Sequence, residues 1–232
     1  MARILLVHGS CHGAWCWDLV LPRLRALGHD VEAIDLPGRL PDDPDPTLDD
    51  HARSISDACP EPTVLVGHSA GGYPITAAAE AGASVSRLIY LCAYVPRAGL
   101  GLADMRRLWP EQPLVPSIRL SEDRQRFTID PGMVRHHFYA DVPAPLAKDA
   151  AARLCPEPVV PQLTPLPATT RAEALPRRYI VCRQDNAIPP DFQREMSADW
   201  PRAHVTELDT SHSPFLSAPD RLAALLDRMA TD

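Results

Sequence analysis

The sequence of 232 residues has no long apolar run and no basic cluster. No stretch reaches the roughly 20 apolar residues that a membrane helix needs, and no run of Lys and Arg is longer than two residues. The net charge is −7, from 23 basic and 30 acidic side chains. We therefore expect no membrane partner and no nucleic-acid partner.

Disulfide, cofactor and metal signatures are also missing. The six cysteines show no framework spacing, and residues 1–7 are apolar but too short for a signal peptide, so we expect reduced thiols and a cytoplasmic protein. No G-x-G-x-x-G, P-loop or haem signature is present. His8 and His12 lie near Cys11 and Cys16, but the H-E-x-x-H glutamate and distant paired ligands are absent. The sequence thus predicts no metal and no cofactor.

Apolar runs of strand length alternate with segments of helical period along most of the chain. This alternation predicts an α/β fold, with a mostly parallel sheet of about six strands flanked by helices. The runs do not alternate between apolar and polar residues, as expected when helices cover both faces of the sheet. The predicted strands are residues 3–7, 31–36, 63–66, 87–91, 178–182 and 204–208, and the predicted helices are residues 15–27, 47–58, 69–81, 190–198 and 219–229.

One segment, residues 96–176, interrupts the alternation. It has no strong strand run, eight prolines lie between positions 143 and 176, and helix-like pieces occupy residues 131–139 and 146–154. Because it follows the fourth predicted strand, we interpret it as a helical cap inserted above the sheet, with residues 1–95 and 177–232 as the core. A surface excursion without a role is the alternative. The acidic stretch 41–46 is typical of a solvated loop.

The most informative motif is Gly67-His68-Ser69-Ala70-Gly71, which joins a predicted strand to a predicted helix. In this context G-x-S-x-G forms a nucleophile elbow, a sharp turn that exposes the serine hydroxyl above the sheet. The alternative is an ordinary glycine-rich turn.

A serine nucleophile needs a base and a group that orients the base. His212 follows the last predicted strand and Asp185 follows the strand before it, so both loops converge near Ser69. We predict Ser69 as nucleophile, His212 as general base and acid, and Asp185 as the orienting carboxylate. The other candidates for the acid are Asp104, the strongest rival, and Asp191 and Asp209.

Two backbone N–H groups are predicted to bind the oxyanion that forms during attack. One belongs to Ala70, at the start of the helix, where amides lack helical partners. The other belongs to Ser10, in the loop after the first strand, where Gly9 permits close approach of the backbone.

Residues 7–17, 27–36 and 66–72 resemble the plant methylesterase and hydroxynitrile lyase family of α/β-hydrolases and its bacterial esterase relatives. The stretch from Gln184 to Gln193 is also similar, and the family's acid aligns with Asp185. The resemblance implies an α/β-hydrolase fold with a cap after the fourth strand. Family members are often dimers, so a homodimer is an open alternative to a monomer.

Two positions separate the activities found in that family. The lyases carry a lysine directly after the catalytic histidine, where this chain has Ser213, and a threonine at the position of Gly9. The resemblance therefore favours a serine carboxylesterase that forms an acyl-enzyme on a small, largely apolar ester. A cofactor-free enzyme that cleaves C–C bonds, and a small-molecule binding protein on a hydrolase scaffold, remain as alternatives.

Aromatic side chains of the cap and core are candidates for the substrate pocket, although plain packing explains them equally well. They are His12, Tyr73, Trp109, Phe138 and Phe215.

Overall fold

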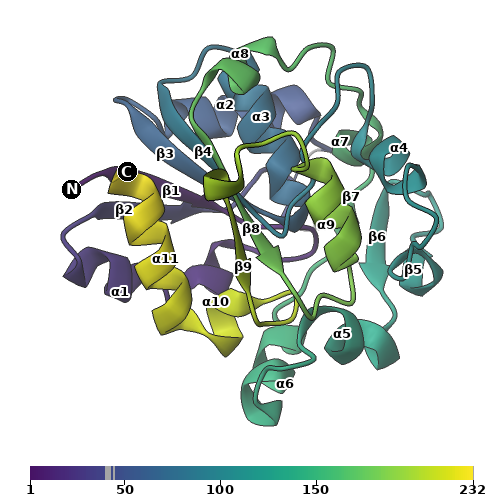
Figure 1. Cartoon of the computed structure of the whole chain (residues 1–232). Helices are drawn as coiled ribbons and strands as arrows, with labels where there is room; N and C mark the ends of the chain where they lie inside the picture. The colour runs from purple at the N-terminus through teal and green to yellow at the C-terminus, as the bar shows by residue number, and fades with distance from the viewer. Residues whose placement is uncertain (40–42, 44, 232) are drawn as a thin grey trace.

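The computed structural model describes residues 1–39, 43 and 45–231, and the predicted loop at 41–46 lies partly outside them. Its centre is a six-stranded, fully parallel sheet in the order β2-β1-β3-β4-β8-β9 (Figure 1). The predicted sheet is confirmed. Its strands are β1 (Arg3–Val7), β2 (Asp30–Ile34), β3 (Thr63–His68), β4 (Val85–Leu91), β8 (Arg177–Cys182) and β9 (Val205–Leu208).

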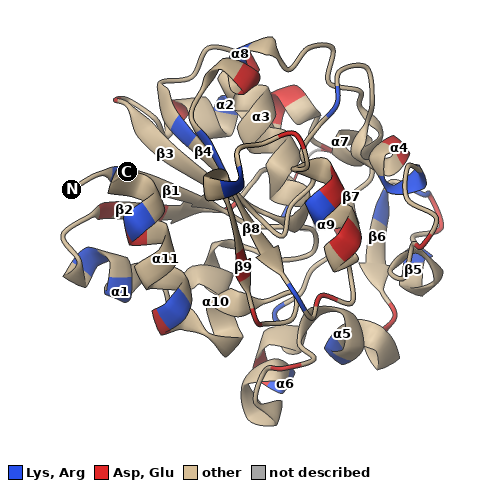
Figure 2. Ribbon diagram, in the orientation of Figure 1, with Lys and Arg blue, Asp and Glu red and all other residues tan. Residues whose placement is uncertain are grey.

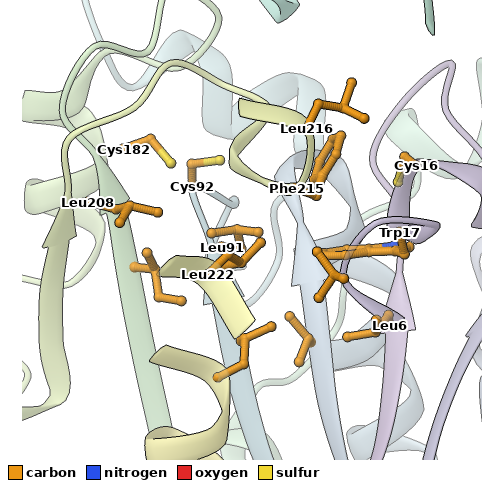
Figure 3. Close-up of a cluster of buried hydrophobic side chains, with 14 of the residues drawn as sticks. Leu6, Cys16, Trp17, Leu91, Cys92, Cys182, Leu208, Phe215, Leu216 and Leu222 are labelled. Carbon is orange, nitrogen blue, oxygen red and sulfur yellow. The ribbon is translucent and has the colours of Figure 1, made fainter. Parts of the chain in front are cut away.

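Each face of the sheet is buried under a separate layer of helices. Ile4 and Leu6 of β1 pack on the layer that contains α1 (Leu21–Ala26) and α11 (Pro219–Thr231), where Figure 3 shows Leu6 near Trp17. Leu5 and Val7 point to the opposite layer. That layer contains α2 (Leu48–Asp57), α3 (Gly72–Glu80) and α9 (Pro190–Met196). Successive strand residues alternate between the faces, so burial on both sides requires the continuous apolar runs seen in the sequence.

The helix expected over residues 15–27 is instead two pieces. The 3-10 helix η1 (Ala14–Trp17) is followed by a turn and then by α1, whose second residue is Pro22. Proline has no N–H to continue a helix but fits its first turn, so the helix restarts there. At the start of α2 the side chains of Thr47 and Asp50 form a capping box.

The insertion after β4 contains helices and also a small antiparallel sheet that the sequence analysis missed. Its strands are β5 (Ile118–Leu120), β6 (Arg126–Ile129) and β7 (Glu157–Pro158). They are two to four residues long, and β7 pairs with a strand some thirty positions earlier, so no local periodicity marks them. The helices are α4 (Leu102–Arg107), α5 (Pro131–Phe138), α6 (Ala144–Ala152), α7 (Val160–Leu163) and α8 (Thr170–Ala174), with the 3-10 turn η3 (Val115–Ser117).

The insertion lies mainly at one side of the molecule. Figure 1 shows α4 to α7 to the right and below the carboxyl ends of β8 and β9. Apolar residues of the insertion, including Phe127 and Phe138, join the hydrophobic cluster of the core. The division into core and cap therefore stays a prediction, because the two share packing.

All six strands run in the same direction, so their carboxyl ends lie along one edge of the sheet. The loops that leave this edge carry the functional side chains described below, as is usual in open α/β sheets. Lys, Arg, Asp and Glu are scattered over helices and loops rather than gathered by sign (Figure 2). Among the described residues, no helix is both long enough and apolar enough to span a membrane.

Candidate active site

The turn between β3 and α3 has the geometry of a nucleophile elbow. Ser69 has a φ of 54°, in the left-handed region that a residue other than glycine rarely adopts. A Cβ on Gly71 would lie 2.7 Å from the carbonyl oxygen of His8, and one on Gly72 would lie 2.0 Å from that of Tyr94. The turn therefore fits against neighbouring backbone only with glycine at these two positions.

Three side chains from separate loops form a continuous hydrogen-bonded chain. His212 Nε2 lies 3.1 Å from Ser69 Oγ, and His212 Nδ1 lies 2.7 Å from Asp185 Oδ2. Asp185 and His212 are buried, whereas Ser69 is partly exposed. Because Nδ1 must donate to the carboxylate, Nε2 carries the lone pair that faces the serine hydroxyl.

Asp185 is held by four hydrogen bonds. Its Oδ1 accepts from the backbone N–H groups of Ala187 and Ile188 at 2.7 and 2.9 Å, and its Oδ2 accepts from Gln193 Nε2 at 2.9 Å as well as from His212. Gln193 is fully buried, and its Oε1 accepts from the N–H of Cys182 at the end of β8. This support fixes the orientation of the carboxylate toward His212.

The rival acids are engaged elsewhere. Asp104 caps the start of α4 and pairs with Arg107, and Asp191 pairs with Arg194. Asp209 accepts from Gln184 at 3.0 Å. All three of these carboxylates are bonded away from His212, whereas Asp185 is bonded to His212 directly.

The loop after β1 packs directly against the nucleophile. A Cβ on Gly9 would lie 2.7 Å from Ser69 Cβ, so a larger residue would displace the loop. Ser10 and Ala70 both line the cavity in front of Ser69. Ala70 lies in the first turn of the 3-10 helix η2 (Ser69–Gly71), where N–H groups lack helical partners.

Residues of the insertion hold this loop, which sequence reasoning missed. Glu157 Oε2 accepts from the N–H of Cys11 at 2.7 Å. Gln162 Nε2 donates to Ser10 Oγ at 2.6 Å and contacts Glu157 Oε1 at 3.3 Å. Burial raises the pKa of Glu157 above its usual range, while the bond from Cys11 acts in the opposite direction. The only local signal was a glutamate between two prolines, Pro156 and Pro158.

Buried histidines next to the site are structural and neutral. His12 Nδ1 donates to the carbonyl of Ser10 at 2.9 Å, and its Nε2 accepts from the hydroxyl of Tyr139 at 2.9 Å. Burial lowers the pKa of His12 to about 3 and also lowers the pKa values of His8 and His68. His12 therefore orders the loop and does not reach the cavity, which corrects its prediction as a pocket residue.

We call the space in front of Ser69 the Ser69 cavity. Its volume is about 20 Å³, the space of about one water molecule, so a substrate enters only with movement of the lining. Phe138 lines it and stacks on the His212 ring with centroids 5.6 Å apart. The complete lining is Ser10, Ser69, Ala70, Tyr94, Leu102, Arg106, Leu114, Phe127, Ile129, Phe138, Gln162 and Ile188.

The other predicted pocket aromatics lie outside this lining. Phe215 is fully buried in the core cluster, and Trp109 stacks on Phe192 with centroids 5.4 Å apart. Tyr73 donates to the carbonyl of Leu100 and lines a neighbouring cavity with His51. Their roles in substrate binding stay predictions, because a side chain's direction depends on packing partners that are distant in sequence.

Among the described residues, one group has the spacing to hold a metal: His68, Cys92 and His212. Their polar atoms are mostly engaged, although the buried Nδ1 of His68 has no hydrogen-bond partner. Both nitrogens of His212 belong to the chain described above, and the carbonyl of His212 accepts from His68 Nε2 at 2.9 Å and from Cys92 Sγ at 3.5 Å. These bonds tie the histidine loop to β3 and to the residue after β4.

Comparison with known proteins agrees with the fold. The alpha/beta hydrolase family model matches residues 4–225. Methylesterase 7 of Arabidopsis thaliana is 30% identical, with 98% of this chain and 96% of the relative covered. A pyrethroid hydrolase of Sphingobium wenxiniae is 31% identical, with 95% and 84% covered.

Solved structures of related hydrolases superpose on this chain over nearly its whole length. A pyrethroid hydrolase from Sphingobium faniae JZ-2 superposes with a TM-score of 0.85 at 29% identity, covering 99% of this chain and 97% of the other. The Arabidopsis methylesterase MES16 has a TM-score of 0.81 at 28% identity, with 98% of each chain covered. With the family model matching nearly the whole chain, this protein belongs to the α/β-hydrolase family and is related to plant methylesterases and a bacterial pyrethroid hydrolase.

Proposed function

We propose that the protein is a serine carboxylesterase that hydrolyses a small, largely apolar ester through an acyl-enzyme on Ser69. The observation that carries the proposal is the chain from Ser69 Oγ through His212 to Asp185, with links of 3.1 and 2.7 Å, beneath a mostly apolar cavity. Relatives named as methylesterases and as a pyrethroid hydrolase support the same class of reaction.

In the first half of the reaction, Ser69 Oγ attacks the ester carbonyl while His212 Nε2 takes its proton. Asp185 stabilises the resulting imidazolium through Nδ1–H, and the N–H groups of Ser10 and Ala70 stabilise the oxyanion. Collapse of the tetrahedral intermediate breaks the C–O bond, and His212 returns the proton to the departing alcohol. Water, deprotonated by His212, then attacks the carbonyl of the acyl-enzyme. Collapse of this second intermediate breaks the bond to Ser69 Oγ, which takes the proton back from His212, and the acid is released.

The structure around the histidine favours hydrolysis over cyanohydrin cleavage. Ser213, at the position of the lyase lysine, is fully buried and brings no charge to the cavity. Gly9 has no space for the threonine of the lyases with the loop in this position.

The test is turnover of p-nitrophenyl butyrate by the wild type and by Ser69→Ala. We expect the variant to lose at least 10⁴-fold in kcat, as for removal of a triad nucleophile, and the wild type to be labelled once, at Ser69, by a fluorophosphonate. Retained activity in Ser69→Ala would refute the nucleophile. A wild type that neither turns over esters nor takes the label would indicate a binding protein, and aldehyde or ketone release without an acyl-enzyme would indicate a lyase.

We also propose a reducing, cytoplasmic location. All six cysteines are free thiols in the structure, and five are buried. We expect six free thiols per chain when protein isolated from its natural source is denatured and titrated with a thiol reagent. A lower count would contradict the proposal.

A further inference from the structure

The Ser69 cavity contains one charged side chain. Arg106, from the last turn of α4, lines it together with apolar residues such as Leu114 and Phe138. Ligand sites typically combine an apolar lining with a few polar groups that fix the orientation of the ligand. A guanidinium in such a lining therefore selects for a complementary group on the substrate.

Most of the hydrogen-bonding capacity of Arg106 is unused by the protein. One nitrogen, Nη2, donates to Gln162 Oε1 at 2.5 Å. No carboxylate of the described residues lies within 4 Å of its nitrogens, although ion pairs of this kind occupy its neighbour Arg107 and many other arginines. A guanidinium has five N–H donors in a planar fork, so several remain for a ligand.

A second cavity continues beyond Arg106. It shares Tyr94, Arg106 and Leu114 with the Ser69 cavity and includes Ala187 and Phe192. Glu111 also lines this outer space, but it forms no ion pair with Arg106 within the described part of the chain. Arg106 thus lies at the junction of two cavities, where a substrate that extends away from Ser69 would meet it.

The buried acid Glu157 does not pair directly with Arg106. Hydrogen bonds link the two only through the side chain of Gln162, and Glu157 is also bonded to the N–H of Cys11 and lies 4.0 Å from the guanidinium of Arg39. Arg106 attracts Glu157 at longer range, but its free N–H donors stay available on the cavity side.

We propose that the natural ester carries a carboxylate remote from the scissile bond, and that Arg106 binds it. Arginine matches a carboxylate with two parallel hydrogen bonds, and a partly desolvated site strengthens them. The inference rests on the proposed esterase function and refines it: the substrate is an apolar ester with one anionic end. Arg106 is then a specificity residue, and Gln162 holds its guanidinium in the cavity wall.

The experiment compares matched charged and neutral esters. Mono-p-nitrophenyl adipate against p-nitrophenyl hexanoate places the charge on the acyl side, and 4-acetoxybenzoate against 4-acetoxybenzamide places it on the alcohol side. We expect the wild type to show at least tenfold higher kcat/KM for the charged ester in one of the two pairs. Arg106→Met should reduce that ratio at least tenfold, mainly through KM, and Arg106→Lys should reduce it less.

Arg107→Met is the matched control, because Arg107 is exposed on the same helix and pairs with Asp104. It should leave the ratio unchanged. A wild-type ratio of one or less in both pairs would overturn the inference. An Arg106→Met variant that slows both esters of a pair equally would also overturn it, because that result would mean that Arg106 has only a structural role. In either case continued hydrolysis of the neutral esters leaves the proposed esterase function intact.

Discussion

The two arms of the site that act on Ser69 are supported by different parts of the chain. In the acid and base arm, Asp185 takes its supporting hydrogen bonds from Ala187, Ile188 and Gln193, all within eight positions. The insertion touches this arm only beside the reacting groups, where Asp141 accepts from Ser211 and the carbonyl of His136 accepts from Asn186. The oxyanion arm, residues 9–12, is satisfied by the insertion, through Glu157, Gln162 and Tyr139, more than 120 positions away.

The two arms therefore differ in the contacts that bring them into position. The carboxylate of the first arm is positioned by local contacts in the loop after β8. The second arm has local bonds at His12, but the N–H of Cys11 and the hydroxyl of Ser10 find their partners only when the insertion docks. Changes in the insertion are thus expected to act on catalysis through the oxyanion loop as well as on substrate selection.

The largest expected effect tests the acid and base arm. Asp185→Asn keeps the size of the side chain but removes the charge that fixes the tautomer of His212, and we expect kcat for p-nitrophenyl butyrate to fall about 10⁴-fold. Asp104→Asn is the control, since Asp104 caps α4 away from the triad and asparagine also caps helices. A large loss in Asp104→Asn with little in Asp185→Asn would reverse the assignment.

An intermediate effect is expected in the oxyanion arm. Glu157→Ala leaves the N–H of Cys11 without its acceptor and frees the loop, and kcat should fall by roughly 10- to 100-fold, less than the loss of an oxyanion donor itself. Glu157→Gln keeps an acceptor and should stay within about threefold of wild type.

A role in positioning is separated from a general loss of stability by measuring kcat and KM separately for both Glu157 variants. The measurement is made at a temperature where circular dichroism shows both variants folded. Equal kcat in Glu157→Ala and the wild type would show that the core alone positions the oxyanion loop. Equal losses in both variants would show that the charge of Glu157 matters rather than its acceptor.

The smallest effect concerns the pH dependence of stability. The pKa of folded His12 is about 3, below the ordinary value of 6.5. Between these values the unfolded chain binds a proton that the folded chain does not, so the free energy of unfolding falls as pH falls, by about 1.4 kcal/mol per pH unit. His12→Gln should therefore flatten the slope between pH 6.5 and 4.5 by about that amount in urea titrations.

His8 and His68 remain in that variant and keep part of the slope, because their pKa values are also lowered by burial. Glu157 acts in the opposite sense, since its folded pKa is raised and its contribution is lost as pH rises. Parallel curves for His12→Gln and wild type would mean that folded His12 takes up a proton in this range.

Much of the fold could be predicted because its signals are local. Apolar runs marked all six strands of the sheet, and Gly67 to Gly71 marked the elbow. The helix expected over residues 15–27 is interrupted at residues 18–20 and restarts with Pro22 in its first turn, a break that the proline itself signals. The small sheet of the insertion was missed because its strands are too short for a period.

The contacts of the site were less predictable. The placement of Asp185 and His212 follows from chain order and a parallel sheet, so the sequence alone predicts both. Gln193, Glu157 and Gln162 were not singled out, because a buried polar residue looks like an exposed one in sequence. The aromatic residues are equally hard to place from sequence: Phe138 faces the cavity, whereas Phe215 packs in the core.

By itself the sequence determined the parallel sheet, the strained serine turn, and the order in which acid and base follow it. These depend on glycine stereochemistry, strand periodicity and strand direction, which act over a few residues. Only the tertiary structure decided which side chains face the Ser69 cavity, that Glu157 holds the oxyanion loop, and that Arg106 points its charge into an apolar space. Such facts depend on the packing of segments far apart in the chain, where burial changes the chemistry of each group.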